Sequence, residues 1–221
     1  MTLSRLGPAC GLLFAPLYAG FTFFSFELPE YFDSDDRVLA VYDDGAPFVL
    51  GSALIALAGA AFLVFLADLH RRLRSADDGG APTLALGGGL LYVAMLFVAG
   101  TLWTGYANAG GGPLESKPDQ LAESVTLARV LPGLGWGVLL VYGMIAAAVM
   151  IIAASAAARR NGALPRGVVV AGFVVAPLLL AGFAWVPQFI VPLWVAAVSV
   201  AGLRRSPETE QAAIRRETAR A

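Results

Sequence analysis

Long apolar runs constrain the fold of this chain more than any other feature. Several of them reach about 20 residues, the length a helix needs to cross roughly 30 Å of hydrocarbon. Hydrophobic residues make up 58% of the chain and charged residues only 14%, which lies outside the range of soluble domains. The sequence therefore predicts an all-α, polytopic transmembrane protein that lies in a lipid bilayer and has no nucleic-acid partner.

Apolar length and charged ends together predict six spans in a six-helix bundle. They cover about residues 6–26, 47–69, 84–103, 132–158, 167–185 and 189–203. The last two share one apolar block, 167–203, which as a single helix would measure roughly 55 Å, nearly twice the bilayer core. The sixth span makes only about 22 Å of helix, which leaves its full crossing open. Residues 1–205 form the transmembrane domain, and 206–221 form a short, charged cytosolic tail.

Basic residues fall almost wholly on one side of these spans. Of the fifteen Lys and Arg, twelve lie in segments that must share one side, and only Arg37, Lys117 and Arg129 lie opposite. Ten of the sixteen acidic residues lie on the arginine-poor side. Cytoplasmic loops carry the excess of basic residues in membrane proteins. We therefore expect a multi-pass protein of the cytoplasmic (plasma) membrane with both termini cytoplasmic.

Two amphipathic segments are predicted on the outer side. Asp33 and Ser34 can cap a short helix that continues to Tyr42, with acidic residues in its first turn. The segment 119–130 indicates a second short helix that leads into the fourth span. Pro132 then suits the first turn of that span, where a missing N–H costs nothing.

The sequence lacks the usual marks of catalysis, metal binding and cofactor binding. No ionisable group lies near the middle of any predicted span, although proton relays and ion pumps usually need one. His70 is the only histidine, which excludes a two-histidine haem or a histidine cluster for a metal, and Cys10 is the only cysteine. Phosphate loops and nucleophile elbows are missing in a suitable context. We predict no catalytic, cofactor-binding or metal-binding residue.

The candidate site lies at the outer boundary of the membrane. Glu27 and Glu30 leave the first span there, and Arg129 enters the fourth span at a similar depth, against the general charge bias. Either these residues form an ion pair that ties two helices, or Arg129 holds an anionic headgroup or carboxylate ligand in a pocket. Three tryptophans near the same interface could line that pocket: Trp103, Trp136 and Trp185.

A second polar cluster lies at the inner end of the second span. Asp68 stands beside His70, and Arg71 and Arg72 follow Asp68 by three and four residues. This spacing fits a salt bridge at a helix end, which lets Asp68 lie near the headgroups. The alternative is a cytosolic proton or ligand site.

Small residues at four-residue spacing indicate close helix packing. Gly133 and Gly137 form such a pair in the fourth span, and glycines occupy 87–89 in the third. Helices in lipid associate through small residues that let backbones approach. The pair in the fourth span fits either packing inside the bundle or a homo-oligomer face.

Several short motifs follow one another along the chain in a familiar order. They are Gly11-Leu12-Leu13-Phe14, Val38–Tyr42 before Phe48-Val49-Leu50-Gly51, Phe65–Leu69, Gly88–Tyr92 and Gly162–Arg166. Together they resemble a domain-of-unknown-function family of small six-span bacterial membrane proteins, over most of residues 6–203. The resemblance implies six helices in a bacterial cytoplasmic membrane and carries no catalytic residue. High Ala, Gly and Arg content indicates a GC-rich genome of the actinobacterial type.

These patterns favour a non-enzymatic integral membrane protein. It would bind a lipid, another small amphiphile or a membrane partner near the outer leaflet. A small secondary transporter, or a subunit of a transporter complex, is the alternative, although it lacks the expected ionisable group at the midplane. An intramembrane enzyme is the third possibility, with the outer carboxylates as acid and base.

Overall fold

The computed structural model describes residues 3–26, 28, 32–43, 46–74, 79–109, 125–180 and 186–204. Within these ranges the chain is all-α: it forms seven helices and a short 3-10 turn, and none of it forms a strand. The predicted tail, 206–221, lies outside the described residues, as do 119–124 at the start of the second amphipathic segment.

Helix bounds follow the apolar runs and extend most of them by several residues. The elements are α1 (Leu3–Ser25), α2 (Asp35–Asp43), α3 (Ala46–Arg74), α4 (Gly80–Ala109), α6 (Val125–Gly137), the π-helix η1 (Val138–Gly143), α7 (Met144–Asn161), α8 (Arg166–Leu180), the 3-10 turn η2 (Val186–Phe189) and α9 (Ile190–Leu203). The elements α6, η1 and α7 form one unbroken helix of 37 residues.

Four of these helices are long and apolar enough to cross a membrane. They are α1, α3, α4 and the continuous helix Val125–Asn161. The apolar helices α8 and α9 are shorter, with 15 and 14 residues. Four candidate spans therefore support the multi-pass character expected from the sequence. Two shorter apolar helices complete the bundle.

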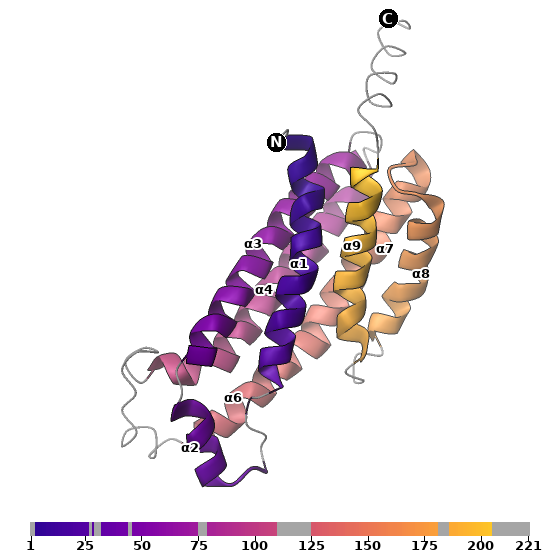
Figure 1. Cartoon of the computed structure of the whole chain (residues 1–221). Helices are drawn as coiled ribbons and strands as arrows, with labels where there is room; N and C mark the ends of the chain where they lie inside the picture. Colours follow the sequence, from indigo (N-terminus) through magenta and orange to yellow (C-terminus); the bar gives the residue numbers. More distant parts are fainter. Residues whose placement is uncertain are drawn as a thin grey trace, which may run out of the picture.

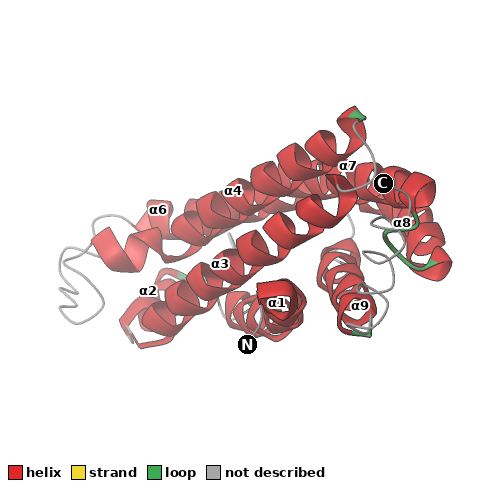
Figure 2. Cartoon of the chain, turned by 90° about the horizontal axis from the view of Figure 1, so that it is seen from above, coloured by secondary structure: helices red, strands yellow, loops and turns green. Residues whose placement is uncertain are grey.

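The long helices stand side by side and alternate in direction (Figure 1). The start of α1 and the end of α9 lie at one end of the bundle, which we call the inner end, and α2 lies at the opposite, outer end. Seen along the bundle, α1 packs between α3 and α9, while α4 packs between α3 and α7 (Figure 2). Helix α8 packs on the other side of α7.

Aromatic rings fill the middle of the bundle. The Phe14 ring of α1 lies 5.5 Å from Tyr18 and 5.1 Å from Phe62 of α3, centroid to centroid. Phe62 in turn lies 5.3 Å from Tyr92 of α4. These tilted contacts suit the quadrupoles of aromatic rings and join three helices in one core.

Glycines allow the closest helix contacts. A Cβ at Gly88 of α4 would lie 2.7 Å from the backbone nitrogen of Met150 in α7. The packing predicted for the glycines of the third span is therefore confirmed for Gly88. A Cβ at Gly133 or Gly137 would meet nothing within 4 Å in the described part of the chain, so this pair does not pack there.

The position predicted for Pro132 is wrong, because the helix begins earlier than the apolar run. Val125 already belongs to the continuous helix, which places Pro132 inside α6 instead of in a first turn. A proline there cannot donate to the carbonyl four residues earlier, that of Ala128. The Tyr42 hydroxyl of α2 donates to that oxygen instead, at 3.3 Å.

Candidate functional site

The outer end of the bundle carries α2, which the sequence predicted as a short capped helix. The Ser34 hydroxyl accepts a long hydrogen bond of 3.4 Å from the backbone N–H of Arg37, as an N-cap should. Val38 and Tyr42 are buried, and α2 contacts α6. The prediction of this helix and its cap is confirmed.

Arg129 pairs with Asp35 at the first residue of α2. The Arg129 side chain is 24% exposed, whereas that of Asp35 is 70% exposed. The Nε atom of Arg129 is buried and has no hydrogen-bond partner in the described part of the chain. Arg129 therefore has an anionic partner, as expected, and that partner is mostly exposed to solvent. Glu27 and Glu30 lie outside the described residues, so their pairing with Arg129 stays a prediction.

Trp103 of α4 and Trp136 of α6 are in contact, and Trp136 lies about two helical turns after Arg129. Their ring centroids lie 4.7 Å apart, and the Trp103 indole N–H donates to the Pro132 carbonyl at 3.0 Å. Trp103 is completely buried, so it packs in the core and does not face lipid as a belt residue would. Trp185 lies outside the described residues.

We call Asp35, Tyr42, Trp103, Arg129 and Trp136 the outer cluster. The sequence pointed to Arg129 and to two of the tryptophans, and it predicted acidic residues in the first turn of α2, but it did not pair Asp35 with Arg129. The packing of α2 on α6 brings Asp35 to Arg129, and no local sequence pattern shows this packing. The outer cluster offers a guanidinium whose buried Nε has no partner among the described residues.

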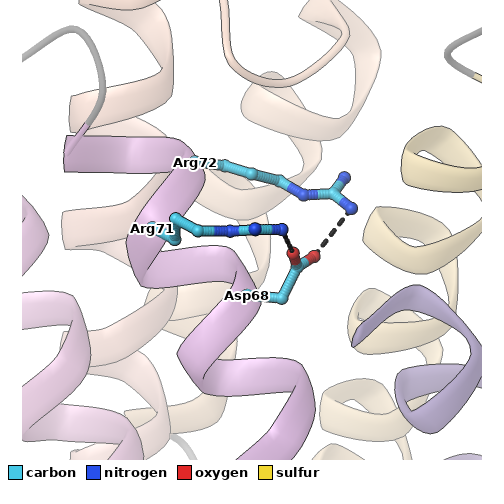
Figure 3. Close-up of polar contacts among 3 residues, drawn as sticks. All are labelled: Asp68, Arg71 and Arg72. Carbon is cyan, nitrogen blue, oxygen red and sulfur yellow. Dashed lines mark hydrogen bonds and ion pairs between the residues drawn. The ribbon is translucent and has the colours of Figure 1, made fainter. Parts of the chain in front are cut away.

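At the inner end, Asp68 holds two arginines of its own helix (Figure 3). One carboxylate oxygen lies 2.6 Å from Arg71 and the other lies 2.7 Å from Arg72. The Asp68 side chain is only 9% exposed, and that of Arg72 19%, whereas Arg71 is 61% exposed. The helix-end salt bridge predicted by the spacing is confirmed.

Glycines on neighbouring helices make room for this ion pair. A Cβ at Gly7 of α1 would lie 2.2 Å from the Asp68 Cβ, and one at Gly202 of α9 would lie 2.4 Å from an Arg72 nitrogen. Asp68 and Arg72 thus lie where α1, α3 and α9 meet. The sequence did not reveal this junction, because nothing in the local pattern shows which helix α9 approaches.

A small cleft opens at the same junction. It is lined by Pro8, Phe65, Asp68, Leu69, Arg72, Val198 and Ser199. The Ser199 hydroxyl is buried and has no hydrogen-bond partner within the described ranges. The cleft, which we call the inner cleft, therefore combines a charged pair with an unpaired hydroxyl.

His70 has a structural contact close by. Its Nδ1 lies 3.0 Å from the carbonyl oxygen of Pro82 near the start of α4, so the protonated nitrogen can donate to that oxygen. The contact ties the end of α3 to the start of α4. Across the residues that the structure describes, no three His, Cys, Asp or Glu side chains gather as metal ligands would.

Comparisons with known proteins add no further assignment. No protein-family profile, curated protein sequence or solved structure matches this chain.

Proposed function

We propose that this chain is a six-span, non-enzymatic protein of the bacterial cytoplasmic membrane, of the kind its short motifs resemble. It binds an amphiphile with an anionic headgroup at the outer cluster. In this proposal α8 and α9 are the fifth and sixth spans, and both termini are cytoplasmic.

The direction of the helices supports the six-span arrangement. The end of α9 lies beside the start of α1, and an even number of crossings brings the chain back to its starting side (Figure 1). Helices of 15 and 14 residues reach about 22 Å, which a bilayer accommodates by thinning locally.

The environment of Arg129 is the observation that carries the proposed ligand. Its partner Asp35 is mostly exposed, so their ion pair gains little in water and an incoming anion can displace the carboxylate. The buried Nε donor lacks a partner among the described residues, and an unsatisfied buried donor costs stability until a ligand accepts from it. An anionic oxygen at this guanidinium would meet both needs.

The test compares lipids that stay bound through purification. Wild type, Arg129→Gln and Asp35→Asn are purified from the same membranes, and bound amphiphiles are identified by mass spectrometry. We expect Arg129→Gln to lose an anionic species that wild type retains. Asp35→Asn should retain at least as much of it, because that change removes the competing carboxylate.

Arg37→Gln is the matched control, since it removes an exposed arginine from the same end. It should leave the bound species unchanged. A purely structural ion pair would instead give two variants of equally reduced stability and identical bound lipids, and this result would exclude the ligand site.

A small secondary transporter is the second candidate. Its support is a pair of buried polar atoms that make no hydrogen bond in the described chain. They are the hydroxyl oxygen of Ser155 in α7 and the indole nitrogen of Trp194 in α9. Uptake into proteoliposomes that depends on a proton or sodium gradient would favour this candidate, and its absence with a retained lipid favours the first.

A further inference from the structure

We propose that the inner cleft is a second binding site, which takes a phosphate group at the cytoplasmic side. The phosphate would come from the headgroup of an anionic phospholipid in the inner leaflet or from free inorganic phosphate. This inference rests on the orientation proposed above, but not on the ligand of the outer cluster.

One of the residues that line the cleft carries a donor that the protein itself leaves unused. Ser199 is 1% exposed, and its hydroxyl has no hydrogen-bond partner in the described chain, although it lines a cleft. A Cβ at Gly11 of α1 would lie 2.1 Å from this oxygen, so the glycine is what allows the hydroxyl to sit there. A buried hydroxyl without a partner indicates a missing acceptor.

The charge around the cleft favours an anion. The two oxygens of Asp68 are each held by a different arginine, at 2.6 and 2.7 Å. One carboxylate thus stands beside two guanidinium groups. Six further arginines are exposed at the same end of the bundle: Arg5, Arg74, Arg159, Arg160, Arg166 and Arg204. Basic side chains therefore outnumber acidic ones among the described residues at this end, and Asp68 positions Arg72 at the cleft.

The size of the cleft limits how the ligand enters. Its total empty space is about 170 Å³, much of it open to solvent, and the enclosed part has room for about one water molecule. A single oxygen of a phosphate fits this enclosed part and accepts from the Ser199 hydroxyl. The other oxygens stay at the mouth of the cleft, and Arg71, which also binds Asp68, is mostly exposed.

The site also has the depth that a headgroup needs. Asp68 and Arg72 lie in the last two turns of α3, which ends at Arg74. Basic pockets between transmembrane helices on the cytoplasmic side are a recurrent place for anionic lipid headgroups. Planar guanidinium groups suit phosphate oxygens through paired N–H donors.

The test uses purified protein and three probes. Short-chain phosphatidylglycerol, short-chain phosphatidylcholine and inorganic phosphate are each titrated, and binding is followed by native mass spectrometry and by the shift in Tm. We expect Ser199→Ala to weaken phosphatidylglycerol binding about fivefold, because it removes one hydrogen bond from an uncharged hydroxyl to the phosphate. Arg72→Gln should weaken it about tenfold or more, since a charge-assisted bond is lost.

Arg74→Gln is the matched control: it removes one exposed charge from the same helix end without lining the cleft. It should change affinity less than twofold. Competition by inorganic phosphate would show that the phosphate group suffices, whereas binding of the lipid alone would assign the site to the headgroup.

Equal affinity for phosphatidylglycerol in wild type, Ser199→Ala and Arg74→Gln would overturn the inference. Phosphatidylcholine also has a phosphate, but its choline cancels the charge. Equal affinity for the two lipids would therefore show that the basic residues do not select an anion, and it would also overturn the inference. Ser199→Ala keeps the packing next to Gly11 and therefore keeps the test valid if Arg72→Gln fails to fold. Loss of the outer ligand in Arg129→Gln with normal phosphatidylglycerol binding would separate the two sites.

Discussion

The hydroxyl of Tyr42 donates a hydrogen bond to the carbonyl oxygen of Ala128. That carbonyl lies four residues before Pro132, whose ring nitrogen has no hydrogen to offer it. The carbonyl that lacks its usual partner within α6 thus accepts a hydrogen bond from α2, which joins the two helices. The Tyr42 ring adds a second anchor, since it stacks on Phe48 at 4.8 Å between centroids.

Removing this hydroxyl should destabilise the outer end by a small amount. Tyr42→Phe keeps the ring stack and deletes the donor, so we expect a loss of about 0.5–1.5 kcal/mol in the free energy of unfolding. Unfolding in detergent mixtures with increasing sodium dodecyl sulfate, followed by circular dichroism, measures the change.

Pro132→Ala supplies the matched background for that test. Alanine at this position restores an N–H that can donate to the Ala128 carbonyl, so the Tyr42 hydroxyl becomes redundant. In this background Tyr42→Phe should cost less than in wild type. If Tyr42→Phe lowers the free energy of unfolding equally in the two backgrounds, the Tyr42 hydroxyl does not compensate for the N–H that Pro132 lacks.

The sequence predicted the helical fold well because apolar length and arginine position act locally. The ends predicted for the second and fourth spans, at about residues 69 and 158 just before arginines, needed no knowledge of the other helices. Predicting which residues pair across helices does require the positions of the other helices. Arg129 was expected to pair with Glu27 or Glu30, which leave the neighbouring span, but the partner that the structure describes is Asp35. The orientation of α2 across α6 decides this, and no local pattern encodes it.

The sequence did not predict the inner cleft, for a related reason. Asp68, Arg71 and Arg72 share one face of α3, so spacing alone predicted their ion pairs. Ser199 and Gly202 come from α9, more than a hundred residues later in the chain. Their approach to α3 depends on how α9 packs against α1, which is a tertiary property.

Adding a methyl group at Gly88 should separate α4 from α7. A Cβ there would lie 2.7 Å from Met150 N and 2.9 Å from Ala146 O, and these backbone atoms cannot move away cheaply. We expect Gly88→Ala to destabilise the protein by about 1–3 kcal/mol. Gly87→Ala is the control, because a Cβ at Gly87 meets nothing within 4 Å. A Tm equal in the two variants would contradict close packing at this glycine.

The two arginines held by Asp68 should contribute unequally to stability. Arg71 is mostly exposed, so Arg71→Gln should cost less than about 1 kcal/mol. Arg72 is largely buried against Gly202, and Arg72→Gln should cost roughly 1–3 kcal/mol because a mostly buried carboxylate loses a partner. Thermal unfolding in one detergent compares them. A larger loss for Arg71→Gln would contradict this ranking.

Accessibility of engineered cysteines tests whether α8 and α9 cross the membrane. Cys10 is the only cysteine, so Cys10→Ser gives a background without thiols. In that background Phe189→Cys, at the turn between the two helices, should react with a membrane-impermeant maleimide in intact cells, as Asp36→Cys on α2 should. Arg74→Cys at the end of α3 should react only after the membrane is permeabilised. If Phe189→Cys behaves like Arg74→Cys, α8 and α9 form a hairpin that stays on the inner side, and the protein has four spans. Labelling of Phe189→Cys from outside requires each of these helices to cross despite its length of about 22 Å.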